Sequence, residues 1–214
     1  MKIDFHIHTK YSKDGFIEPK ALAKKAGQCG ITFAVTDHNT ILAHSDFKKL
    51  NIKFIPGEEI KSDAGDVIGL YINELIPRKI PFYEAIDKIH EQGGLVYLPH
   101  MFDITRNGVG ARNDIDKIDI IEVFNARCIK HGFNNKAKEF AEKNNLPKAA
   151  GSDSHFLWEF GSTYTQVANF DLENPKALLK ALCNAKTHGT AAPIYVHGAT
   201  ELLMLYKKLF GWIN

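Results

Sequence analysis

Short runs of β-branched and other apolar residues alternate with helical patterns along the whole chain. Residues 81–92 illustrate the helical pattern, because Phe82, Ala85, Ile86 and Ile89 fall at positions i, i+3, i+4 and i+7, and glycines follow at 93 and 94. The same reasoning predicts helices over 19–29, 81–92, 134–145, 175–187 and 199–212. Strands are predicted over 2–5, 31–35, 52–55, 95–98, 118–124 and 148–150, with a hairpin over 59–72.

Alternation of strands and helices at this spacing is typical of a parallel sheet with helical crossovers. The runs amount to about seven βα units, which fits a barrel and leaves a doubly wound sheet as the alternative. No repeat, low-complexity tract or linker interrupts the pattern, so we predict one domain over residues 1–214. The last predicted helix places Leu202, Leu205, Tyr206 and Leu209 on one face.

Polar side chains follow the predicted strands at the point where each strand ends. His6 and His8 stand two residues apart after the first strand, so they face the same way. In a barrel the carboxyl ends of the strands meet at one rim, where chemistry is assembled, and this placement favours the barrel. The candidate metal ligands selected in this way are His6, His8, Asp14, His38, Glu59, His100, Asp153 and His155.

The candidate ligands combine imidazoles with carboxylates. This mixture suits zinc, manganese or iron better than calcium or magnesium, which prefer oxygen ligands alone. Eight ligands exceed what one ion takes from a protein, so we infer two or three divalent transition-metal ions. A carboxylate can bridge two ions with its two oxygens, and Glu59 is the candidate because it lies between the flanking histidines. Ions of this kind lower the pKa of bound water and supply hydroxide as a nucleophile.

Composition and charge restrict the partners. The chain is 44% hydrophobic and 24% charged, which is ordinary for a globular protein, and its formal net charge of +2 gives no support for binding long nucleic acid. The cysteines, Cys29, Cys128 and Cys183, are scattered and odd in number, which favours a reducing compartment. With no signal-peptide pattern and no apolar run of membrane-spanning length, we expect a cytoplasmic protein without a membrane partner.

These motifs, taken together, resemble the PHP (polymerase and histidinol phosphatase) domain family of metal-dependent phosphoesterases. The matching segments follow the family's order and are Asp4–Thr9, Ser12–Gly15, Thr36–Asn39, Gly57–Ile60, Pro99–His100, Ile121–Asn125 and Gly151–His155. The resemblance implies a distorted (β/α)7 barrel with a centre of two or three metal ions. It also implies a catalytic centre around Glu59, His100 and Asp153.

The resemblance further implies how the ligands are shared among the ions. The first ion takes His6, His8, Glu59 and Asp153, the second takes Glu59 and His100, and the third takes Asp14, His38 and His155. The family usually completes the second ion with a His or Cys after the strand that contains Glu122 and Val123. Here Cys128 or His131 can serve, or neither, and a buried apolar role is the alternative for Cys128.

Two arginines are candidate phosphate clamps, because a guanidinium pairs with phosphate through two parallel hydrogen bonds. Arg106 lies on a glycine-containing loop after the His100 strand, with a solvent-facing role as its alternative, and Arg127 follows the next strand. The predicted function is hydrolysis of a small phosphate ester, such as a nucleotide or a phosphorylated metabolite. The alternatives are an amidohydrolase, a nuclease acting on short oligonucleotides, and a non-catalytic metal-stabilised module of a nucleic-acid enzyme.

Other polar residues near the rim receive structural interpretations. Asp37 is expected to hydrogen-bond within the fold, Glu122 to be paired in the barrel wall, and Asp103 either to orient His100 or to cap a loop. The remaining histidines of interest are expected at the surface: His44, His90, His188 and His197.

Overall fold

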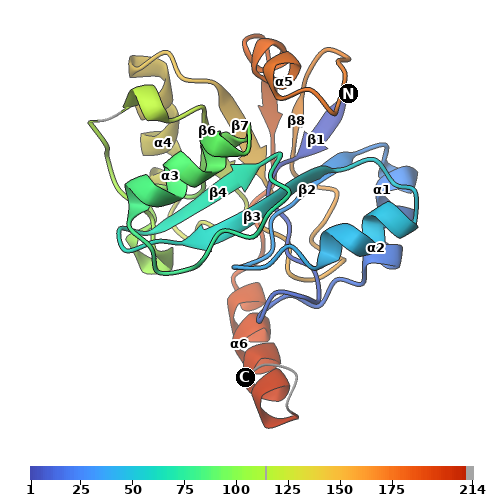
Figure 1. Cartoon of the computed structure of the whole chain (residues 1–214). Coiled ribbons are helices and arrows are strands. Elements are labelled where there is room, and N and C mark those ends of the chain that lie inside the picture. The colour runs from blue at the N-terminus through green and yellow to red at the C-terminus, as the bar shows by residue number, and fades with distance from the viewer. Residues whose placement is uncertain (114, 211–214) are drawn as a thin grey trace.

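In the computed structural model of the chain, residues 1–113 and 115–210 are described. Over these residues nine strands form one sheet that curls into a nearly closed barrel (Figure 1). In chain order the strands are β1 (Lys2–Asp4), β2 (Thr32–Val35), β3 (Ile55–Lys61), β4 (Asp66–Leu70), β5 (Leu95–Leu98), β6 (Ile120–Asn125), β7 (Lys148–Gly151), β8 (Tyr164–Gln166) and β9 (Lys186–His188).

The sheet has the order β7-β6-β5-β4-β3-β2-β1-β8-β9. Neighbouring strands are parallel except around β4, which is antiparallel to both β3 and β5, and around β8, which is antiparallel to β1 and β9. The barrel closes where the chain after β7 meets the chain after β1. There the Asp153 amide donates to the His6 carbonyl at 2.8 Å, and the His8 amide donates to the Ser154 carbonyl at 2.9 Å. These two hydrogen bonds draw together the ends of the first and seventh strands.

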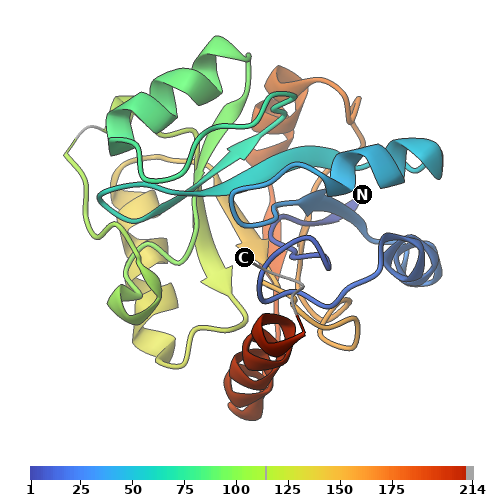
Figure 2. The ribbon, with the colours of Figure 1, turned by 60° about the horizontal axis from the view of Figure 1, so that its bottom comes forward.

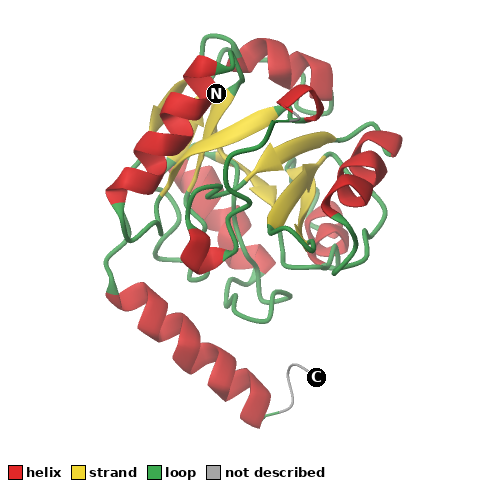
Figure 3. Cartoon of the chain, turned by 90° about the vertical axis from the view of Figure 1, so that its left-hand side faces the viewer, coloured by secondary structure: helices red, strands yellow, loops and turns green. Residues whose placement is uncertain are grey.

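Helices cover the outside of the barrel and both of its ends (Figures 1 and 2). α5 lies at the end where the chain begins, and α6 projects from the opposite end, as Figure 3 also shows. No helix of the described segments is long and apolar enough to cross a membrane. The helices are α1 (Pro19–Cys29), α2 (Ala43–Lys49), α3 (Phe82–Glu91), α4 (His131–Lys143), α5 (Pro175–Leu182) and α6 (Tyr195–Leu209), with short 3-10 turns at Ile104–Arg106 and Ile115–Lys117.

Apolar side chains fix the helices to the sheet. Ile86 and Ile89 of α3 are fully buried in one cluster with Val96 of β5, while Leu22 of α1 packs in another cluster with Phe33 of β2. Burial of each such side chain contributes about 1.5–3 kcal/mol to stability. The barrel wall that carries the strand ends is therefore rigidly supported from outside.

Most of the predicted elements are confirmed, and so is the barrel. Helix α1 begins with Pro19 and ends at Cys29, and the next residue, Gly30, has the left-handed φ of 63° and donates its amide to the Ala26 carbonyl. The predicted hairpin is also confirmed, because β3 and β4 pair antiparallel with Glu59 opposite Ile68. Strand β4 therefore interrupts the strict alternation of parallel strands and helices, and this is one source of the distortion.

The C-terminal part of the chain differs from the prediction. The helix predicted over 175–187 ends at Leu182, and Lys186–His188 instead forms β9 beside the unpredicted β8. Both strands are only three residues long, too short for a periodicity signal. The helix predicted over 199–212 is α6, which begins earlier, at Tyr195, and ends at Leu209; positions 211 and 212 lie outside the described residues. The predicted apolar face of α6 is solvent-exposed, and the helix docks instead through Val196, Thr200, Leu203 and Lys207.

Candidate metal centre

The selected polar side chains converge at the rim end of the barrel. His6 and His8 follow β1, His38 follows β2, and Glu59 lies within β3. His100 follows β5, while Asp153 and His155 follow β7, and Asp14 comes from the loop between β1 and α1. All of them are buried except His38, which is half-buried. Asp14, His38, Glu59, His100, Asp153 and His155 line a cavity of about 380 Å³, which Lys13, Arg106, Arg127, His197, Thr200 and Met204 also line.

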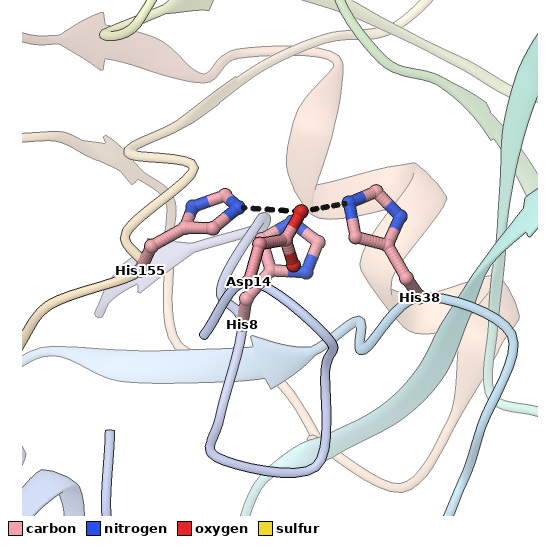
Figure 4. A group of neighbouring side chains, drawn as sticks. All are labelled: His8, Asp14, His38 and His155. Carbon is pink, nitrogen blue, oxygen red and sulfur yellow. Dashed lines mark ion pairs between the residues drawn. The ribbon is translucent and has the colours of Figure 1, made fainter. Parts of the chain in front are cut away.

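Four of the ligands form a compact group (Figure 4). The group consists of His8, Asp14, His38 and His155, whose ligand atoms all lie within 4.8 Å of one another. Asp14 Oδ2 lies 3.3 Å from His38 Nε2 and 3.6 Å from His155 Nε2. The other oxygen, Asp14 Oδ1, is buried and has no hydrogen-bond partner. A buried carboxylate oxygen without a partner among three imidazoles fits a site for a cation.

Glu59 lies between this group and the opposite side of the cavity. Its Oε2 atom lies 3.0 Å from His38 Nδ1 and 3.3 Å from both His6 Nε2 and His8 Nε2. Its Oε1 atom lies 3.2 Å from His100 Nε2. The two oxygens therefore face two different sets of imidazoles, which is the geometry that a bridging carboxylate needs.

Asp66 is a candidate ligand that the sequence reasoning missed. Together with Glu59 and His100 it forms a second group with ligand atoms within 4.8 Å of one another. Asp66 is the first residue of β4 and pairs with Lys61, so its side chain lies on the same face of the hairpin as Glu59. The predicted hairpin could have identified Asp66 as a ligand, because antiparallel pairing brings the start of β4 beside the end of β3.

Asp153 connects the imidazoles of β1 to an arginine. Asp153 Oδ1 lies 3.3 Å from His8 Nε2, and with His6 and His100 it forms a further group of potential ligands. Asp153 Oδ2 accepts a hydrogen bond from Arg106 Nη1 at 2.5 Å. Backbone φ is positive at both His100 (30°) and Asp153 (54°), a region that residues other than glycine seldom adopt. Such conformations cluster at functional sites.

Cys128 lies outside these ligand groups of the described residues. Its Sγ atom lies 3.4 Å from Arg106 Nη2, and burial raises the pKa of its thiol to about 12. A protonated thiol is a poor metal ligand. The side chain of the alternative, His131, lies outside the described residues. Asp66, and not Cys128, is the additional side chain that the structure brings to Glu59 and His100.

The two arginines have different contacts. Arg106 is partly exposed in the cavity, where it contacts Asp103, Asn125 and Asp153. Arg127 borders the cavity, but its guanidinium is buried and its Nε and Nη2 atoms donate to Glu159 at 2.9 and 2.8 Å. Its Nη1 atom donates to Thr200 at 3.0 Å. Arg127 thus connects Glu159 with Thr200 of α6, and its side chain is less exposed than that of Arg106. Its role as a phosphate clamp stays a prediction.

Buried carboxylates that are not themselves candidate ligands hydrogen-bond to the ligands or to their neighbours. Glu122 lies 3.1 Å from His6 Nδ1 through Oε1, and its Oε2 atom accepts from the His100 amide at 2.7 Å. Tyr97 donates its hydroxyl to Glu122, which is therefore paired within the barrel wall as expected. Asp37 has the structural role expected of it, since it accepts from Thr9 and Ser12. Partners of this kind fix the ring orientation of ligating histidines.

The predictions for Asp103 and for the histidines expected at the surface are confirmed in part. Asp103 caps the following turn by accepting from the Thr105 amide and the Arg106 side chain. His90 and His188 are exposed. The prediction was wrong for His44, which is buried and bonded to Gly57, and for His197, which lines the cavity.

Opposite charges set the protonation of the centre in the absence of ions. Burial lowers the pKa of His38, but Glu59 and Asp14 outweigh it and raise that pKa to about 10. Burial and the neighbouring His155 and His38 lower the pKa of His8 to about 3. Burial acts to raise the pKa of Asp153, but His6 and Arg106 hold it well below its usual range. The neighbouring imidazoles likewise hold the pKa values of Asp14 and Glu59 well below their usual range against the effect of burial.

Comparison with protein families gives this geometry a context. The PHP domain model matches residues 4–92, and the PHP-associated model matches residues 131–187. An uncharacterized protein of Methanocaldococcus jannaschii is 40% identical over 186 residues, covering 83% of this chain and 75% of that protein. The first matched range contains all candidate ligands before His100.

Two solved structures share the fold. A two-domain protein from Bacteroides vulgatus, described as containing a predicted PHP-like metal-dependent phosphoesterase, matches with a TM-score of 0.68 at 20% identity. That match covers 88% of this chain, which spans 65% of the Bacteroides chain. PsfC from Pseudomonas syringae matches with a TM-score of 0.65 at 15% identity, covering 96% of this chain and 98% of PsfC.

Proposed function

Because this chain belongs to the PHP domain family, we propose that it is a metal-dependent phosphoesterase acting on a small phosphate ester. The observation that carries the proposal is the position of Glu59, whose two oxygens face different sets of imidazoles around one cavity. A structural metal site is closed and saturated by the protein, whereas Glu59 and most of the other ligands here line an open cavity. This contrast speaks against a non-catalytic module.

The residues present fit two or three divalent ions. His8, Asp14, His38 and His155 would hold one ion, and Glu59, Asp66 and His100 would hold another. His6 and Asp153 complete the centre between them. When bound, such ions lower the pKa of water and stabilise negative charge on a phosphoryl group. The mixed nitrogen and oxygen ligands favour zinc, manganese or iron over calcium.

Arg106 is the residue we assign to the phosphate. Its guanidinium is held by Asp103 and Asn125, so its planar fork is already oriented before a substrate arrives. An oriented guanidinium beside the ligand Asp153 can pair with a phosphate oxygen and favour the more highly charged transition state. The cavity of about 380 Å³ suits a small ester, such as a nucleotide or a phosphorylated metabolite.

Protein treated with a chelator and then reloaded with Zn²⁺, Mn²⁺ or Fe²⁺ tests the proposal. We expect reversible loss of hydrolysis on a panel of phosphate monoesters, diesters and short oligonucleotides, with amide and carboxylic-ester substrates included. Arg106→Ala should lower kcat/KM by about 10–1000-fold without changing metal content, and Arg106→Lys should recover part of the loss.

Arg78 is exposed and outside the cavity lining, so Arg78→Ala is the matched control. Failure of metal-loaded protein to hydrolyse any phosphate ester would exclude the proposal. Turnover of amides or carboxylic esters alone would favour the amidohydrolase alternative. Activity confined to oligonucleotides would favour the nuclease.

A further inference from the structure

The C-terminal helix α6 belongs to the wall of the metal centre. It lies at the rim end of the barrel and outside both family-matched ranges (Figures 1 and 3). His197, Thr200, Glu201 and Met204 of this helix line the cavity. The helix is nevertheless attached to the barrel by few contacts, since much of its surface is exposed. The identity of those contacts therefore matters.

The first contact is an ammonium group held by backbone carbonyls. Lys207 is 1% exposed, and its Nζ donates to the carbonyls of Lys10, Ser12 and Gly15 at 3.1, 2.7 and 2.6 Å. An ammonium has three donors, and here each donor has an acceptor. A long charged side chain is seldom buried unless its charge is compensated in this way.

The segment that Lys207 holds carries a metal ligand. Asp14 lies between Ser12 and Gly15, the second and third carbonyls that accept from Lys207. A Cβ atom at Gly15 would lie 2.0 Å from the Thr9 carbonyl oxygen, so the loop is folded tightly on itself. Lys207 therefore fixes the backbone on both sides of Asp14.

The second contact leads to the other loop-borne ligand. Thr200 Oγ1 accepts from Arg127 Nη1, and Arg127 forms a two-point pair with Glu159. Glu159 Oε2 in turn accepts from the amides of His155 and Phe156 at 3.0 and 2.9 Å. Through this chain of buried groups, α6 is connected to the backbone of His155.

The two loops also meet each other, since the Phe16 amide donates to the His155 carbonyl at 2.7 Å. Asp14 lies on the loop between β1 and α1, and His155 lies on the loop that follows β7. We propose that α6 is a strap that positions Asp14 and His155, with Lys207 as its principal positioning residue. The affinity of the four-ligand group for a divalent cation then depends on the docking of α6.

Coupling of this kind is reciprocal. If docked α6 strengthens cation binding, then a bound cation must stabilise the docked helix by the same factor. Loss of a group that orients metal ligands costs about 10–100-fold in metal affinity. The proposal rests on the metal centre and makes no use of the phosphoesterase activity, so it is tested without substrate.

The test is a Mn²⁺ titration of metal-free protein by calorimetry, with hydrogen exchange of residues 195–209 measured with and without Mn²⁺. Lys207→Met should weaken one class of Mn²⁺ site by about 10–100-fold, leave the remaining sites unchanged, and remove the Mn²⁺-dependent protection of α6. Lys207→Arg retains donors for the carbonyls and should recover part of the affinity. The adjacent exposed Lys208 gives the matched control Lys208→Met, which should titrate like the wild type.

Thr200→Val removes the second contact and should weaken the same class of site by a smaller factor. If Lys207→Met does not fold, the same Mn²⁺ titration is made on Thr200→Val instead. Wild-type Mn²⁺ affinity in folded Lys207→Met, or in Thr200→Val where only that variant folds, would overturn the proposal. A wild-type protein whose α6 gains no protection from Mn²⁺ would overturn it as well.

Discussion

The two sides of Glu59 are built differently. On one side His8, Asp14, His38 and His155 surround one point, and the loops that carry Asp14 and His155 are bonded to each other. On the other side Glu59 and His100 are joined by Asp66, and Arg106 lies against Asp153 and Cys128. The first side is assembled from ligands alone, while the second combines ligands with a cationic side chain. We infer that the second side is the one arranged for an anionic substrate.

Removal of the group common to both sides should have the largest effect. Glu59→Gln keeps the size of the side chain but removes its negative charge and one of its two acceptor oxygens. Both sides should lose affinity, and kcat/KM should fall by more than about 100-fold, beyond the cost of losing an orienting partner. Metal analysis and steady-state kinetics measure the two losses. A variant that retains its metal content and turnover would show that Glu59 does not bridge.

Single substitutions should remove the metal ion from one side of Glu59 at a time. Asp14→Asn should reduce metal content on the side of the three imidazoles, and Asp66→Asn should do so on the side of His100, each leaving the other ion in place. Cys128→Ser should leave metal content unchanged, because Cys128 lies outside the ligand groups of the described residues. Metal analysis of the three purified variants decides between Asp66 and Cys128 as the additional ligand. A loss of metal in Cys128→Ser alone would favour the thiol.

The smallest expected effect is a difference between the two sides of Glu59 in how their cation affinity changes with pH. A cation must displace the proton from His38, whose pKa is raised to about 10 by Glu59 and Asp14 against the effect of burial. Affinity on that side should therefore rise by about tenfold per pH unit through neutrality. On the other side, burial and then Glu59 raise the pKa of Asp66 to about 6, so the dependence on that carboxyl should end above about pH 6.

Mn²⁺ titrations of Asp66→Asn and Asp14→Asn at several pH values measure the two dependences separately. Titrations in buffers of different ionisation enthalpy count the protons released. A Mn²⁺ affinity in Asp66→Asn that does not change with pH through neutrality would contradict the assignment of the proton to His38.

The sequence by itself determined the ligand set that follows the strands. Short apolar runs predict strands, and in a barrel their carboxyl ends meet at one rim, so His6, His8, His38 and His100 can be placed without coordinates. The hairpin over 59–72 was readable for the same reason, because its turn residues and alternation are local signals. These features depend on residues close together in the chain.

The tertiary structure decided the roles that depend on distant partners. Asp66 joins the centre through antiparallel pairing, and Arg127 connects Glu159 with Thr200 through hydrogen bonds that join distant parts of the chain. Lys207 resembles any helix lysine in sequence, yet it is buried on carbonyls more than 190 residues away. The same packing leaves the apolar face of α6 in solvent. Which face of a helix docks, and which charges are paired, follows from long-range complementarity that no local pattern encodes.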